Sequence, residues 1–283
     1  MAKAEKTEEQ VTKQVAVQPK AGLPAGLDLA SVEADAGAGS QNMQASDMQT
    51  PIISVLQANS PQCKKSDGKY IKGAEEGMFY NNVTNEVYSG EDGLIVVPCF
   101  FEKVYIEWKP NRGGFVEAHP ASTPLKDKVK MTPSSENPDK LVPVLPNGNI
   151  LMETNQHYVL RLKADGGFEP AVLAMTSSAL KTSRQWNYLV KSITVPGSKG
   201  QFNPASYYSQ YKLKTVPRQS DQFSWFGMQV ENLGPVPSND VYNAGRALEK
   251  AVNSGTVRVK QEPVETDSAP ASAAGKIDDE IVF

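Results

Sequence analysis

Short runs of β-branched and aromatic residues, separated by glycine and proline, fill the middle of the 283-residue chain. The run 93–98 is apolar almost throughout, which is typical of a strand buried on both faces. Its continuation alternates, with Val104, Ile106 and Trp108 on one face. Many short strands with few helices predict a mainly β protein, either a barrel or a sandwich. Further runs of this kind occupy 51–57, 78–83, 86–88, 148–153, 157–163, 171–175, 207–216 and 223–230.

Two segments have the spacing of helices. The first is 177–190, with Ser177 or Ser178 as its N-cap. The second is 239–252, an amphipathic stripe that ends before Gly255. We therefore expect one helix in the core and one amphipathic helix after the last strand.

The two ends of the chain contain few large apolar side chains, so burial there cannot offset the entropy of ordering. A transient helix near 27–33 is compatible with the first of them. Within the core, residues 118–140 are polar and predict a loop. The predicted organisation is a disordered segment 1–47, a core 48–235, an amphipathic helix 236–255 and a disordered acidic tail 256–283.

Composition limits the chemistry that the chain can perform. Its two histidines, His119 and His157, and two cysteines, Cys63 and Cys99, do not stand in zinc-binding spacings. The phosphate-binding motifs G-x-x-x-x-G-K-[ST] and G-x-G-x-x-G are absent. We expect no cofactor, no metal and no enzymatic activity, while a histidine acting as a general base stays open.

Hydropathy gives no sign of a membrane segment. The sequence has no apolar run of the roughly 18–20 residues that span a bilayer, and residues 1–20 lack the apolar stretch of a secretory signal. We expect a protein that stays in the cytoplasm, where its cysteines remain thiols.

The net charge of −3 combines two segments of opposite charge. Residues 155–218 contain nine lysines and arginines and two carboxylates, a balance of +7. Residues 262–283 contain six carboxylates and one lysine, a balance of −5. A basic segment attracts polyanions, and the release of their counterions supplies affinity. The same charge balance also fits a solvated basic face that binds nothing.

Aromatic residues are interleaved with these cations, and nine of them lie within the 41 residues 186–226. In the run 206–214, alternation places Tyr208, Lys212 and Lys214 on one face of a strand. Such a face suits single-stranded nucleic acid, because aromatic rings stack on unpaired bases while lysines follow the phosphates.

The predicted contacts to nucleic acid combine these patterns with a weaker basic and aromatic set around Trp108. Trp186 and Phe223 are assigned to the core instead. The predicted contact residues are Lys103, Tyr105, Trp108, Lys109, Arg112, Arg161, Lys163, Lys181, Arg184, Tyr208, Tyr211, Lys212, Lys214 and Trp225.

The last six residues form the most specific motif, an acidic run followed by Ile281, Val282 and Phe283. This motif resembles the C-terminal tip of bacterial single-stranded-DNA-binding proteins, in which an Asp-rich run ends in Ile-Pro-Phe. Val282 stands here in place of the proline. The resemblance implies a docking peptide whose terminal ring enters an apolar pocket of a partner and whose acids meet a basic rim. The predicted docking residues are Asp278, Asp279, Glu280, Ile281, Val282 and Phe283.

The core resembles phage-encoded single-stranded-DNA-binding proteins. The resemblance rests on the segment 51–61, on the Val-Val-Pro strand ending at Pro98, on the Glu107-Trp108 pair that follows, and on the tail. It implies an elaborated oligonucleotide-binding (OB-fold) barrel of five strands, with one or two added helices and disordered tails.

These patterns predict a non-enzymatic protein that binds and protects single-stranded DNA, with little sequence preference, in phage replication, recombination or repair. Its tip is expected to recruit polymerase, helicase, primase or nuclease proteins and to compete with DNA for the basic groove. Self-association stays open. Three alternatives remain: a strand-annealing protein that forms rings, a magnesium-dependent nuclease using carboxylates such as Asp92 and Glu107, and a virion structural protein.

Overall fold

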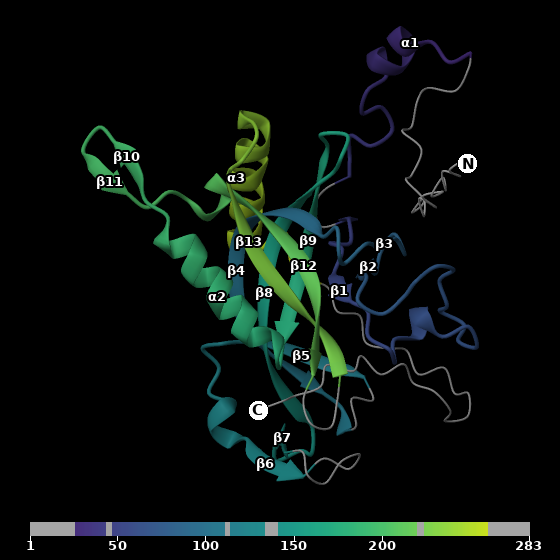
Figure 1. Ribbon diagram of the computed structural model, residues 1–283, viewed down its shortest axis with the longest axis vertical. Coiled ribbons are helices and arrows are strands. Elements are labelled where there is room, and N and C mark those ends of the chain that lie inside the picture. The colour runs from purple at the N-terminus through teal and green to yellow at the C-terminus, as the bar shows by residue number, and fades with distance from the viewer. Residues whose placement is uncertain (1–25, 44–46, 111–113, 134–140, 220–223, 260–283) are drawn as a thin grey trace, which may run out of the picture. The chain divides into compact units, whose positions relative to one another are not determined.

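The computed structural model describes residues 26–43, 47–110, 114–133, 141–219 and 224–259 (Figure 1). The chain divides into two units, residues 1–43 and residues 44–283. The first unit contains the helix α1 (Leu29–Ala34), whose amino end is capped by Asp28. The Asp28 carboxylate accepts hydrogen bonds from the amides of Ala30 and Ser31. This helix lies where a transient helix was expected.

The second unit is built of antiparallel β-sheet, which confirms the predicted mainly β fold. The largest sheet has the strand order β13-β12-β4-β8-β7-β6, with β5 paired to β4 and β9 paired to β8. A three-stranded sheet, β1-β2-β3, and a two-stranded sheet, β10-β11, accompany it. The strands are β1 (Ile53–Val55), β2 (Phe79–Asn81), β3 (Val87–Tyr88), β4 (Leu94–Trp108), β5 (Phe115–Pro120), β6 (Lys130–Pro133), β7 (Leu141–Val144), β8 (Ile150–Leu162), β9 (Phe168–Thr176), β10 (Val195–Gly197), β11 (Gly200–Phe202), β12 (Ser209–Gln219) and β13 (Ser224–Pro235).

The long antiparallel pair β4–β8 is the spine of the large sheet. The two strands pair from Ile95 with Leu162 to Trp108 with Ile150. The first half of β4 also pairs with β12, and its second half pairs with β5. The large sheet therefore has two halves, β13-β12-β4-β8-β9 and β5-β4-β8-β7-β6, which share the spine.

A short segment around β1 connects the outer strands of the first half. The Pro51 carbonyl accepts a hydrogen bond of 2.8 Å from the Val172 amide of β9. The side chain of Gln57 accepts from the Phe226 amide of β13 at 2.8 Å and donates to the Phe226 carbonyl at 2.9 Å. The segment 51–57 thus bonds to β9 at one end and to β13 at the other. The side-chain amide of Gln57 makes the two backbone hydrogen bonds to Phe226 that a neighbouring strand would otherwise make.

Helices cover both faces of the spine. Val96 and Val97 are adjacent in β4 and both fully buried, but they belong to different cores. Val96 packs in the core that contains Trp186 of the helix α2 (Ala179–Ser192). Val97 packs in the core that contains Val241 of the helix α3 (Asn239–Asn253). The strand is therefore buried on both faces from Val96 to Cys99, as predicted, whereas Ile95 at the start of the apolar run is exposed.

Both predicted helices are confirmed. The amino end of α3 is capped as expected, since the Ser238 hydroxyl accepts a hydrogen bond from the Val241 amide at 3.3 Å. Gly245 brings α3 close to the sheet unit, because a Cβ there would lie 2.7 Å from the Cβ of Tyr207. None of the helices in the described ranges is both long and apolar enough to cross a membrane.

Three local predictions are corrected. The polar segment 118–140 is not only a loop, because it contains the end of β5, all of β6 and a 3-10 turn at Lys126–Lys128. The two strands expected at 148–153 and 157–163 are one strand, β8, since the polar residues between them are buried. Tyr208 lies in a 3-10 turn (Ser206–Tyr208) rather than in the following strand.

Candidate functional site

A cleft of about 790 Å³ lies where the two halves of the large sheet meet α2. Its walls come from the amino end of α2, from residues 126–131 of the insertion between β4 and β8, from the start of β8 and from the ends of β12 and β13 that face each other. In Figure 1 this is the region at the end of α2 that points away from the hairpin β10–β11.

The cleft is basic. Among the described residues, four cations line it: Lys126, Lys181, Arg184 and Arg218. None of these four forms an ion pair with another part of the described chain. The carboxylate that the described residues contribute to the lining, Glu153, is bonded at 2.8 Å to Lys103. The charge of the cleft is therefore available to an anion.

The amino end of α2 adds to this positive potential. No side chain caps it, and its first turn contains no acidic residue. Uncapped amides at a helix amino end carry partial positive charge and can donate to an anion. Ser177, just before the helix, has a φ of +51°, and its hydroxyl oxygen is buried without a hydrogen-bond partner in the described chain.

Apolar and aromatic groups form the rest of the lining. Trp225 on β13 is half-buried at one side, and Tyr105 on β4 is 9% exposed at the other. Leu151 and Val129 pack around Tyr105. A cleft that joins cations to flat apolar surfaces suits a ligand with anionic groups and aromatic rings.

A buried polar network fixes α2 beneath this cleft. The Ser183 hydroxyl, 0% exposed, accepts from the Asn155 amide at 2.8 Å and lies 2.7 Å from the Nε2 atom of His157. The His157 ring stacks on Trp186, with 4.5 Å between the ring centres. Burial lowers the pKa of His157 to about 3, so the ring is neutral at physiological pH. Its Nε2 atom can therefore accept a hydrogen bond from the Ser183 hydroxyl. Strand β8 and helix α2 are thus joined by matched polar groups.

Comparison with known proteins identifies a phage family. Residues 20–258 match the family described as Pam3 phage gp34-like protein, a span that covers most of the chain. The chain belongs to the Pam3 phage gp34-like protein family. The match indicates a phage protein and includes every element from α1 to α3. No curated protein and no solved structure gives a significant match.

The cleft of this gp34-like protein brings together four of the predicted contact residues: Tyr105, Lys181, Arg184 and Trp225. They come from three elements, β4, α2 and β13, that are far apart in the sequence. Sequence reasoning missed Lys126 and Arg218. Arg218 lies in the basic segment 155–218 but is not among the predicted contact residues. Lys126 lies in the segment 118–140, which the sequence predicts as a loop.

Tyr211 is corrected. Its side chain is 0% exposed and packs against Trp186, so it is a core residue rather than a surface contact. Burial raises the pKa of its hydroxyl to about 12. Trp186 is a core residue as predicted, whereas Phe223 lies outside the described residues.

Lys212 and Lys214 lie on the face of β12 opposite to Tyr211, as the alternation predicts, and neither lines the cleft. Their neighbours on β13 are Glu231 and Gln229. Tyr208 is half-buried in its 3-10 turn. These three predicted contacts therefore lie apart from the cleft.

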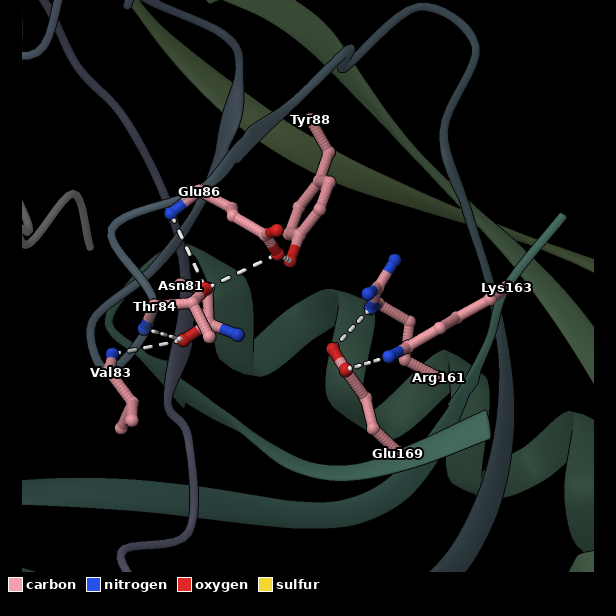
Figure 2. Close-up of polar contacts among 8 residues, drawn as sticks. All are labelled: Asn81, Val83, Thr84, Glu86, Tyr88, Arg161, Lys163 and Glu169. Carbon is pink, nitrogen blue, oxygen red and sulfur yellow. Dashed lines mark hydrogen bonds and ion pairs between the residues drawn. The ribbon is translucent and has the colours of Figure 1, made fainter. Parts of the chain in front are cut away.

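Arg161 and Lys163 are each bonded to the same carboxylate. Glu169 accepts from Arg161 Nε at 2.7 Å and from Lys163 Nζ at 2.8 Å (Figure 2). Burial acts to raise the pKa of Glu169, but the two cations outweigh it and hold the pKa below its usual value. The Arg161 guanidinium also lies over the Tyr88 ring, 4.4 Å from its centre, which links β8 to the small sheet. Tyr88 in turn donates to Glu86 at 2.6 Å.

Two more predicted contacts, Trp108 and Lys109, lie near the far end of β4. Trp108 packs edge-on against Phe115, with 6.2 Å between the ring centres, and Lys109 is exposed beyond the strand. Arg112 and the docking residues Asp278, Asp279, Glu280, Ile281, Val282 and Phe283 lie outside the described residues.

Asp92 and Glu107, the two carboxylates of the magnesium-dependent nuclease alternative, do not lie close together. Asp92 precedes β4 and Glu107 lies near its other end, so the rise of a strand separates them by roughly 40 Å. Glu107 is buried, and it accepts hydrogen bonds from Asn147, Asn149 and His119. Burial acts to raise its pKa, and these bonds lower it overall. Within the described ranges, no three His, Cys, Asp or Glu side chains are grouped as metal ligands.

Proposed function

We propose that this gp34-like protein binds single-stranded DNA in the cleft beside α2. The observation that carries the proposal is the set of four cations that line the cleft without a carboxylate partner in the described chain. Trp225 and the edge of Tyr105 supply flat surfaces beside these cations. Single-strand binders combine a basic groove with aromatic rings on which unpaired bases stack.

The topology supports the same proposal. Strands β4, β8, β9, β12 and β13, with α2 between the third and the fourth, follow the order of an OB-type barrel. In such barrels nucleic acid contacts the second and third strands and the loops between strands one and two and between strands four and five. Three parts of the lining support this comparison: the insertion after β4, the start of β8 as the second strand, and the adjoining ends of β12 and β13.

The proposed role is protection of exposed strands during phage replication, recombination or repair. Contacts to phosphates and to base faces are the same for every sequence, so binding has little sequence preference. The proposal contains no catalytic step.

The proposed role of the C-terminal tip is recruitment of replication or recombination proteins. The tail carries a charge of −5 between residues 262 and 283. As an anion attached to the same chain, the tail has a local concentration on the order of millimolar, so it is proposed to compete with phosphates for the cleft at low salt. Phe283→Ala should leave DNA affinity unchanged and abolish capture of replication proteins from an infected-cell lysate. Retention of every captured protein would contradict this role.

The experiment that tests the proposed function compares a labelled single strand with its duplex by fluorescence anisotropy, using the full chain. The single strand should bind more tightly, because only unpaired bases expose their faces. Arg218→Ala should weaken binding, whereas Lys69→Ala, which removes an exposed cation away from the cleft, should not. Equal affinity for the duplex, or equal effects of the two variants, would contradict the proposal.

A further inference from the structure

The exposed face of α2 continues the basic surface of the cleft. Lys181, Arg184, Tyr188 and Lys191 follow one another at intervals of three or four residues, so they lie along one side of the helix. All four are exposed, and Tyr188 is 72% exposed. The first two line the cleft and the last two lie beyond it.

No carboxylate interrupts this surface along the chain. Residues 170–219 contain seven lysines and arginines and no aspartate or glutamate. The described chain forms no ion pair with Lys181, Arg184 or Lys191. A helix face of this kind is complementary to a polyanion rather than to an apolar or a mixed-charge protein surface.

The hairpin β10–β11 extends the surface past the end of α2. The Asn203 side chain donates to the Lys191 carbonyl at 2.9 Å and to the Ile193 carbonyl at 2.8 Å, which ties the base of the hairpin to the helix end. The Phe202 ring is 52% exposed and lies against Gly197, where a Cβ would be 2.9 Å from the ring. In Figure 1 the hairpin follows the end of α2 and stands away from the large sheet.

We infer that single-stranded DNA leaves the cleft along the exposed face of α2 and reaches the hairpin. Tyr188 and Phe202 stack on bases, and Lys191 and Lys199 contact phosphates. From Lys181 to Lys191 the helix rises about 15 Å, so this path lengthens the site beyond the cleft. The inference rests on the proposed function, because it extends the same site.

The test uses two labelled oligonucleotides, of about 4 and about 16 nucleotides, the limits of the range for one OB-type barrel. Tyr188→Ala should weaken binding of the long strand by about 5- to 100-fold, the value of one stacked base, and leave binding of the short strand unchanged. Tyr188→Phe should restore the affinity, since it keeps the ring. Val83→Ala, which removes an exposed apolar side chain from the turn between β2 and β3, is the control away from the cleft and α2 and should have no effect.

The outcomes separate this inference from the proposed function. If the wild-type chain binds neither oligonucleotide, the proposed function fails. If it binds both, and Tyr188→Ala has no effect on either, the path along α2 is wrong while the cleft stands. An effect of Tyr188→Ala on the sedimentation of the free protein, without an effect on affinity, would also overturn the path and assign this face to a second copy of the chain.

Discussion

The two faces of α2 carry similar kinds of residue in opposite settings. On the inner face, Ser183 and Trp186 are 0% exposed and meet His157 of β8. On the outer face, Arg184 and Tyr188 are exposed, and the described chain supplies no carboxylate to them. The inner face therefore fixes the helix to the sheet, and the outer face is left exposed by the described chain. The role of each face of α2 is therefore decided by the residues that pack against it, and not by the sequence of the helix alone.

Removing the largest inner side chain should have the largest effect. Trp186→Ala should lower the free energy of unfolding by about 3–5 kcal/mol, because it leaves a cavity between His157 and Tyr211. Denaturant unfolding measures this change. Tyr188→Ala on the outer face should change stability by less than about 0.5 kcal/mol. Equal losses from the two variants would remove the distinction between the faces.

The second-largest effect should be a loss of folding stability at acidic pH, caused by His157 on the inner side of α2. The pKa of His157 is about 3 in the folded chain and 6.5 when unperturbed, so the unfolded chain binds the extra proton below pH 6.5. The stability present above pH 6.5 is therefore lost as pH falls towards 3, by about 3 kcal/mol between pH 7 and 4.5. Unfolding curves at several pH values measure the loss. His157→Gln should flatten the dependence over this range, and a flat curve for the wild-type chain would contradict the buried neutral ring.

Several elements could be predicted because their signal is local. The run ending at Pro98, the cap at Ser238 and the stripe that buries Val241 and Leu248 all follow from neighbouring residues, whereas the side-chain cap predicted at Ser177 or Ser178 does not form. The sequence predicts two strands in place of β8 because the residues between them, Thr154 to Gln156, are polar. These residues are buried, and Asn155 bonds to Ser183 of α2, a contact that has no local signal.

The site could be predicted only in part, for the same reason. A charge count treats Arg184 and Arg161 alike, but the second is bonded to Glu169 and the first is not bonded to a carboxylate in the described chain. The frequency of aromatic residues around Tyr211 favours its prediction as a contact. Strand alternation, however, places Tyr211 on the same face of the strand as Leu213, and that face is buried. Burial of one strand face by a distant helix decided the outcome.

The smallest expected effect concerns the paired cations. Glu169→Gln should lower stability by about 1 kcal/mol or less, since the pair is partly exposed and screened by solvent. It should change the affinity for a single strand by less than about threefold, because the pair lies outside the cleft. Thermal unfolding and anisotropy measure the two quantities. A large gain in affinity would show that Glu169 masks a part of the binding surface.

The central claim is that the unpaired cations beside α2, rather than basic charge in general, hold the DNA. The most direct measurement is the slope of log affinity against log salt for a single strand, in two double variants that each remove two positive charges. Lys181→Ala/Arg184→Ala should reduce the slope by about 1.4, since each lost phosphate contact contributes about 0.7. Arg161→Gln/Lys163→Gln should leave the slope of the wild-type chain unchanged, with unfolding curves as the control for folding. Equal reductions in the two variants, or a reduction confined to the second, would contradict the account.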